Sequence, residues 1–283
     1  GEIRICSISF PDRSYVIDLF HTKTFEPVRA ALHNSRCVKI LHNAKFDQKW
    51  LLAKYKVELW PVFDTYKASA LLYNGQGLGH NLYNVYEREL NVKPAVEDMG
   101  DSRWAGAISD EQYMYAAEDV TYSHALREVL RKKLLDAGMS KVALLEFGAI
   151  LPEAEMELNG IRLDTERWRE LYARNLKASR EMAIKLSTEL PHPKGQVGLF
   201  GGSTNFSINS TQQLQQSLAY LGLDLTSTSE KELAMQAGDH PILREVIKYK
   251  KLSKKLTAFG LDYLEHVDSV TGRIHTNFFA FTE

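Results

Sequence analysis

Two groups of polar residues in the first half of the chain have the types and spacing of a catalytic site. The first group is Asn43, Phe46 and Asp47, and the second is Tyr115 with Asp119 four residues later. The first group follows a short apolar run that is typical of a strand, and it begins a segment of helical period. Ligands of open α/β sheets bind at such strand ends, so a carboxylate placed there is a candidate metal ligand.

Each group also has an ordinary structural interpretation. Asn43 is well placed as an N-cap whose side chain accepts from backbone N–H groups, and Asp47 would complement the helix dipole. Tyr115 and Asp119 share one face of a predicted helix, as many hydrogen-bonded pairs do. A phenol and a carboxylate on one face would also position a water and a divalent metal ion, so neither group decides the function alone.

The elements that must position these residues form an α/β pattern followed by helices. Residues 3–20 predict a hairpin and residues 37–41 a third strand, and helices are predicted over 26–34, 46–55, 64–72, 81–90 and 110–135. Beyond about residue 140 helices dominate, over 142–158, 165–190, 212–221 and 241–264, before a turn into a strand near 271–278. We therefore predict an α/β domain over residues 1–140 and a helical domain over residues 141–283.

The two groups gain specificity from the motifs around them. Between Asn-x-x-Phe-Asp at 43–47 and Tyr-x-x-x-Asp at 115–119 lie Phe-Asp-Thr at 63–65 and Gly-His-Asn-Leu at 79–82. This order resembles the 3′–5′ exonucleases of the ribonuclease H-like superfamily, in the branch with tyrosine in the last motif. The resemblance covers residues 1–138 and implies a ribonuclease H-like α/β fold.

The resemblance implies a two-metal hydrolysis of phosphodiesters. Asp47 and Asp119 would be metal ligands, Tyr115 would orient the attacking water, and Asn43 and Phe46 would meet the substrate strand. Two divalent ions activate the water and stabilise the leaving oxygen. Mg²⁺ or Mn²⁺ suits carboxylate ligands, so two such ions are the implied cofactors.

One expected motif of that family is absent. Asp-x-Glu, which the family carries on its first strand, does not occur near the start of this chain, where Glu2, Asp12 and Asp18 lack the spacing. We therefore expect the α/β domain to lack its first strand and two of four carboxylates. The expected result is a chain that by itself cleaves DNA ends poorly or not at all.

The second half resembles the thumb of family A DNA polymerases, the bacterial DNA polymerase I type. The resemblance covers about residues 145–283 and is carried by Asn-Gly-Ile-Arg-Leu-Asp at 159–164, Phe-Ser-Ile-Asn-Ser at 206–210, Tyr-Lys-Lys-Leu-Ser-Lys at 249–254 and Thr-Gly-Arg-Ile-His-Thr at 271–276. The last motif matches the family's entry into the palm and places Arg273 among the implied DNA-binding residues. The polymerase active site is expected beyond residue 283.

A basic stretch supports DNA as the partner. Residues 244–255 carry six lysines and arginines and one glutamate. Such a helix can hold duplex phosphates without reading sequence, and we expect Lys250, Lys251 and Lys254 to do so. The alternative is a solvated helix face.

Composition limits the class of protein. The 283 residues have a formal charge of −1, with 44% hydrophobic and 25% charged residues, which is typical of a globular chain. No apolar run is long enough to span a membrane, so no membrane partner is expected. Cys6 and Cys37 lie in apolar runs, which favours buried thiols in a reducing compartment. We expect a monomer in the cytoplasm, whether bacterial, phage-infected or organellar.

The sequence thus predicts part of a DNA polymerase that combines a proofreading exonuclease with a thumb. The exonuclease would take a single-stranded 3′ end, and the thumb a primer–template duplex. One alternative is an RNA-trimming exonuclease of the ribonuclease D type. Another is a DNA-binding module without catalysis.

Overall fold

The computed structural model describes the chain except residues 1, 23, 94, 96–103, 193–206 and 282–283. The chain divides into two compact units, called unit 1 (residues 1–160 and 275–283) and unit 2 (residues 161–274). Phe206, the first residue of one thumb-like motif, lies outside the described residues. In the described part, no helix is both long enough and apolar enough to cross a membrane.

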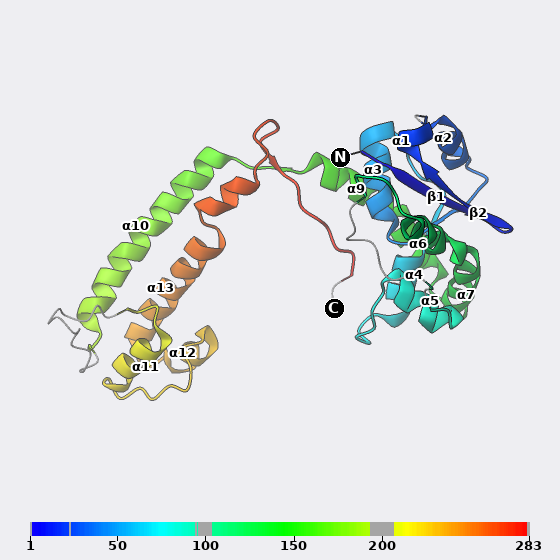
Figure 1. Cartoon of the computed structure of the whole chain (residues 1–283). Helices are drawn as coiled ribbons and strands as arrows, with labels where there is room; N and C mark the ends of the chain where they lie inside the picture. Colours follow the sequence, from blue (N-terminus) through cyan, green and yellow to red (C-terminus); the bar gives the residue numbers. More distant parts are fainter. Residues whose placement is uncertain (1, 23, 94, 96–103, 193–206, 282–283) are drawn as a thin grey trace. The chain divides into compact units, whose positions relative to one another are not determined.

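Unit 1 combines short strands with helices (Figure 1). Its elements are β1 (Ile5–Phe10), β2 (Arg13–Asp18), α1 (Leu19–Thr22), α2 (Glu26–His33), β3 (Lys39–Leu41), α3 (Ala44–Tyr55), β4 (Val62–Asp64), α4 (Thr65–Tyr73), α5 (Leu82–Leu90), α6 (Asp110–Thr121), α7 (Ser123–Asp136), α8 (Ser140–Gly148) and α9 (Ile150–Asn159). The helix predicted over 110–135 is therefore two helices, because the chain departs from helical geometry at Tyr122. The predicted helix 142–158 is likewise divided at Ala149, three residues before Pro152, whose ring nitrogen has no hydrogen to donate.

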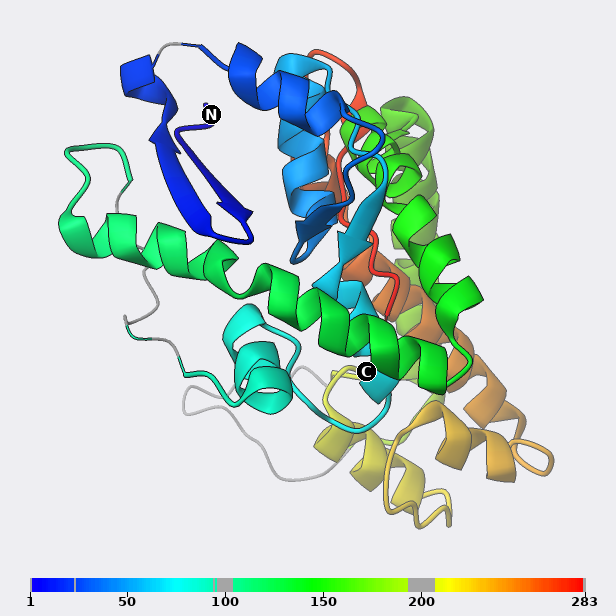
Figure 2. The same ribbon diagram turned by 90° about the vertical axis from the view of Figure 1, so that its right-hand side faces the viewer.

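The strands of unit 1 form two separate pairs rather than one sheet in the described residues. β1 and β2 are an antiparallel hairpin whose register runs from Ile5 opposite Asp18 to Phe10 opposite Arg13, which confirms the predicted hairpin. β3 and β4 are parallel, with Leu41 opposite Asp64. Figure 2 shows the two pairs, with α6 and α7 extending along them; α6 packs on the hairpin and α7 on β3.

Unit 1 has one hydrophobic core, and the helices after residue 136 belong to it. Leu126, Leu130 and Leu134 of α7 repeat every four residues and are buried. Three buried side chains of α8 and α9 join the same core: Ala143, Phe147 and Ile150. The compact unit therefore extends to Gly160, whereas the sequence placed the domain boundary near residue 140.

Unit 2 is helical, with one very short ladder at its ends. Its elements are β5 (Ile161–Arg162), α10 (Thr165–Glu189), α11 (Thr211–Ala219), α12 (Glu230–Gln236), α13 (Pro241–Ala258), the 3₁₀ helix η1 (Leu261–His266) and β6 (Arg273–Ile274). α10 and α13 lie side by side (Figure 1). The core between them and the shorter helices consists mainly of leucines: Leu186, Leu190, Leu214, Leu218, Leu233 and Leu243.

Candidate active site and basic helix

The candidate site of unit 1 is built around a turn at Asn43 that a neighbouring carboxylate holds. Asn43 has φ 60° and ψ 51°, the left-handed region, and its side chain makes no capping hydrogen bond. The predicted capping role of the Asn43 side chain is therefore wrong. Instead the Asp64 carboxylate accepts from the backbone N–H of Asn43 at 3.1 Å and of Ala44 at 2.9 Å. The left-handed turn points both N–H groups toward β4, where Asp64 ends the strand.

Asp64 also caps the next helix. Its Oδ1 accepts from the backbone N–H groups of Tyr66 and Lys67, at 2.9 and 3.3 Å. The side chain is buried, and burial raises its pKa although four backbone N–H groups oppose that shift. The Phe-Asp-Thr motif contained this residue, but its four-fold backbone role was not predicted. The signal available was an acid at the end of a strand paired with the strand that precedes Asn43.

Asp47 lies in the first turn of α3, close to Asp64. Burial, and after it the charge of Asp64, raise the pKa of Asp47 to about 7. A charge interaction with Asp47 also contributes to the raised pKa of Cys6 on β1, so the hairpin, α3 and β4 converge here. A carboxylate with a pKa raised by burial and a like charge is typical of functional sites, although structural clusters show it too.

Tyr115 and Asp119 lie on α6 within a group of aromatic rings. Tyr83 of α5 donates its hydroxyl to Asp119 Oδ1 at 3.1 Å, and Tyr86 donates to the Asp119 carbonyl at 2.9 Å. The rings of Tyr83 and Tyr115 meet edge to face at 6.2 Å, and Trp104 packs on Tyr115 at 6.3 Å. These contacts fix both candidate residues, and sequence reasoning did not identify the two α5 tyrosines.

Among the residues that the structure describes, no group of three or more His, Cys, Asp or Glu side chains is arranged to hold a metal ion. Asp64 is a poor additional ligand because its oxygens already accept four backbone hydrogen bonds. A complete two-ion centre is therefore not assembled from the residues that the structure describes.

Asn43 and Phe46 line a pocket of about 320 Å³ in unit 1. The Phe46 ring is 60% exposed, which is unusual for an aromatic side chain next to a core. Lys45 and Lys49 of α3 lie on the same pocket, together with residues 277–281 of the chain. The structure thus brings the two predicted substrate-binding residues of unit 1 together in one pocket.

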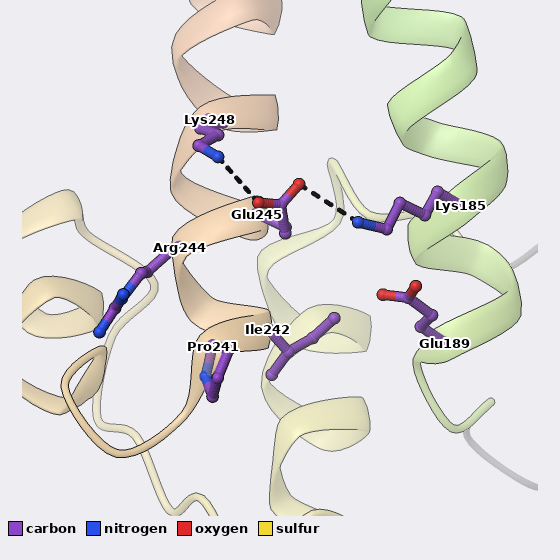
Figure 3. A pocket seen from close by; sticks show the side chains of 7 residues that line it. All are labelled: Lys185, Glu189, Pro241, Ile242, Arg244, Glu245 and Lys248. Atoms are coloured by element: carbon purple, nitrogen blue, oxygen red, sulfur yellow. Dashed lines mark hydrogen bonds and ion pairs between the residues drawn. The ribbon is translucent and has the colours of Figure 1, made fainter.

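The basic stretch of unit 2 lies on α13, and several of its charges already have partners. Figure 3 shows Glu245 between Lys248 and Lys185 of α10, at 2.9 and 3.5 Å, beside a pocket of about 410 Å³. The hydrogen bond from Lys248 is the main cause of the lowered pKa of Glu245. In the same group Arg244 donates to the carbonyls of Ala237 and Gly238.

The predicted DNA-binding lysines differ in their surroundings. Lys250 is half-buried and donates to the carbonyl and hydroxyl oxygens of Thr228, at 2.5 and 2.8 Å. Lys251 forms an ion pair with Glu230 at 2.6 Å. The ammonium groups of Lys254 and Lys255 are exposed and have no ion pair within the described part of unit 2. Arg273 is half-buried on β6, opposite Arg162.

Residues 1–135 match the family model of a 3′–5′ exonuclease domain. Two curated relatives match most of the chain. "DNA polymerase I" of Aquifex aeolicus is 28% identical over 98% of this chain and 49% of its own length, and "DNA polymerase I" of Chloroflexus aurantiacus is 31% identical over 87% of this chain and 27% of its own. The chain thus spans half or less of the length of these relatives.

Two solved structures also resemble this chain. Brucella melitensis NrnC superposes on 56% of this chain and 77% of its own, with a TM-score of 0.52 and 29% identity. The polymerase domain of Pol1 from M. smegmatis, solved with a DNA primer–template and dNTP, covers 94% of this chain and 44% of its own, with a TM-score of 0.68. At 21% identity this likeness shows a shared fold only; together with the exonuclease model on residues 1–135, it confirms the predicted ribonuclease H-like α/β fold followed by helices.

Proposed function

We propose that unit 1 is a 3′–5′ exonuclease domain and that unit 2 is a thumb that holds DNA. The chain resembles bacterial DNA polymerase I across both units. The observation that carries this proposal is the match to DNA polymerase I over 98% of the chain, with the exonuclease model on residues 1–135. One unit would take the single-stranded 3′ end and the other the primer–template duplex.

In this proposal the hydrolytic site is formed by residues of α3 and α6 and by Asn43, which precedes α3. Domains of this exonuclease family use divalent metal ions, and we assign one carboxylate ligand each to Asp47 and Asp119, with Mg²⁺ or Mn²⁺ as the ion. Such ions activate water and stabilise the leaving oxygen. Tyr115 is assigned the orientation of the attacking water, and Asn43 and Phe46 the grip on the substrate strand.

Exonuclease activity of the purified chain is expected to be weak, because the Asp-x-Glu motif that supplies two of the family's four carboxylates does not occur near the start of this sequence. A 5′-labelled single-stranded oligonucleotide with Mg²⁺ should be shortened slowly from its 3′ end, and Asp119→Ala should remove that shortening. The control is Asp136→Ala, which alters an exposed ion pair on α7. Rapid digestion that survives Asp119→Ala would contradict the assignment of this carboxylate.

An RNA-trimming exonuclease remains a second candidate because of one observation. NrnC, which one solved structure shows bound to pGG, resembles 56% of this chain at 28–29% identity. An RNA oligonucleotide of the same sequence in the same assay separates the two: preference for RNA favours trimming, and preference for DNA favours proofreading. Binding to either without any shortening would favour a DNA- or RNA-binding module without catalysis.

Duplex binding by unit 2 is expected to depend on the lysines without internal partners. Replacing Lys254 and Lys255 with glutamine should weaken binding to a DNA duplex and reduce the slope of log K against log salt by up to about 2. The double variant Lys141→Gln and Lys231→Gln removes the same charge from α8 and α12 and is the control. Fluorescence anisotropy from 50 to 200 mM salt makes the measurement; equal slopes for both double variants would disprove DNA contact at the end of α13.

A further inference from the structure

The pocket beside Asn43 and Phe46 has a wall that comes from the far end of the chain. Residues 275–281, called the return segment, re-enter unit 1 after unit 2. Asn277, Phe278, Phe279, Ala280 and Phe281 line the pocket opposite the first turns of α3. Its volume of about 320 Å³ lies at the lower end of the range for small-ligand pockets.

One buried carboxylate fastens the return segment to α3. The side chain of Glu157 on α9 is only 1% exposed, and it accepts from Lys45 at 2.7 Å and from Lys49 at 2.5 Å. Its Oε1 also accepts from the backbone N–H of Phe278 at 2.8 Å. Burial works to raise the pKa of Glu157, yet the hydrogen bonds from the two lysines leave it below its usual value.

Further contacts fix the same segment. Lys45 donates to the carbonyl of Phe278, and the ring nitrogen Nδ1 of His275 lies 3.0 Å from the Glu157 carbonyl. The Lys45 ammonium also lies 5.8 Å from the centre of the Phe279 ring, a cation–π distance. The return segment is therefore held by side-chain and backbone contacts around a single buried acid.

The pocket offers stacking surfaces without excess positive charge. Phe46 is 60% exposed and Phe279 76% exposed, although both belong to a unit with a well-formed core. The side-chain amide of Asn43, which offers both a donor and an acceptor, is exposed on the same pocket and makes no hydrogen bond to another described residue. Exposed aromatic rings beside a free amide suit a nucleobase, which presents a flat face for stacking and an edge for hydrogen bonds.

We propose that this pocket takes a nucleobase of single-stranded nucleic acid between the rings of Phe46 and Phe279, and that Glu157 is the positioning residue that holds the Phe279 wall in place. The proposal deepens the proposed function, because it assigns a substrate subsite next to the α3 residues. The pocket lining carries three lysines (Lys45, Lys49 and Lys67) and three acids (Asp64, Glu153 and Glu157), so stacking rather than phosphate attraction provides the affinity. Binding here requires neither metal nor cleavage.

The test measures binding of the whole chain to an unstructured 6-nucleotide probe, oligo-dT or oligo-rU, in EDTA. Phe279→Ala is expected to weaken binding about 5- to 100-fold, since stacking on one aromatic ring contributes that much. Its effect should be equal at low and high salt, because no charge is removed. Phe10→Ala, which removes an exposed ring of the β1–β2 hairpin, is the matched control.

Two further variants separate stacking and positioning from folding. Phe279→Trp should retain affinity, and the fluorescence of its new indole should be quenched when the probe binds. Glu157→Gln should weaken binding as Phe279→Ala does. Combined with Phe279→Trp in a double variant, it should also abolish the quenching of the indole fluorescence. If Phe279→Ala and Phe10→Ala both bind like the unmodified chain, or if the indole fluorescence does not respond, the subsite is disproved.

The binding test of the Phe46–Phe279 subsite and the exonuclease assay can fail independently of each other. A chain that cuts DNA but is insensitive to Phe279→Ala retains the proposed function and loses this subsite. A chain that binds through Phe279 and whose cutting of DNA survives Asp119→Ala retains the subsite and loses the catalytic assignment of Asp119. Equal loss on oligo-dT and oligo-rU supports a base-stacking site that accepts both sugars, whereas loss on one alone identifies the polymer that the pocket takes.

Discussion

Replacing Asp64 with alanine is expected to lower the free energy of unfolding of unit 1 by about 3–5 kcal/mol. Asp64 accepts four backbone hydrogen bonds, and two of these donors, the N–H groups of Ala44 and Lys67, are buried. A buried donor left without an acceptor costs about 1–3 kcal/mol. Urea unfolding of the chain followed by circular dichroism measures the change.

Two other variants identify the cause of that loss. Asp64→Asn keeps one oxygen acceptor and should lose less stability than alanine. Asp110→Ala, an exposed acid in the first turn of α6, should change stability by less than about 1 kcal/mol. If Asp64→Ala behaved like Asp110→Ala, the Asp64 carboxylate would not be what holds the turn at Asn43.

Replacing Asp47 with asparagine is expected to stabilise unit 1 at neutral pH. The pKa of Asp47 is raised to about 7 in the folded chain, so between about pH 4 and 7 the folded state binds more protons than the unfolded state. The contribution of the Asp47 carboxyl to the free energy of unfolding is therefore highest at about pH 4 and below, and it is lost as pH rises toward 7. Asparagine resembles the protonated carboxyl. The free energy of unfolding of the variant should therefore exceed that of the unmodified chain by about 2–4 kcal/mol at pH 8 and equal it near pH 4.

The measurement is the difference in unfolding free energy between the variant and the unmodified chain at pH 4, 6 and 8, without divalent ions. Asp12→Asn, which alters an exposed ion pair at the hairpin turn, should give a difference that does not vary with pH. A constant difference for Asp47→Asn as well would show that the site does not destabilise the ionised carboxylate. Loss of function with gain of stability is the pattern expected of a residue kept for its chemistry.

Local sequence signals were sufficient for much of the fold. The helices predicted from residues 212 and 110 begin close to those positions: Ser210 accepts from the N–H of Gln213, and Ser109 with Gln112 forms a complete capping box. The β1–β2 hairpin followed from two alternating runs around Pro11 and Asp12. These features depend on residues a few positions apart, so the spacing in the sequence contains the information.

The candidate site could be predicted only in part, because its decisive contacts join distant segments. Asn43 fits an N-cap by type, but its left-handed backbone depends on Asp64, twenty-one residues later. Glu157 resembles any acid of an amphipathic helix, and nothing nearby in sequence indicates that Lys45, Lys49 and Phe278 would enclose it. Charge counting likewise identified the basic helix but not which lysines have internal partners.

The pairing of β5 with β6 gives the two units a fixed order of completion during synthesis. Unit 2 begins at Ile161 and ends at Ile274, which are paired neighbours in this ladder, so unit 2 is inserted between two stretches of unit 1. A ribosome delivers all of unit 2 before the return segment. Unit 2 can therefore finish folding first, before the backbone N–H of Phe278 is available to donate to Glu157. Of the two units, unit 1 is therefore completed after unit 2.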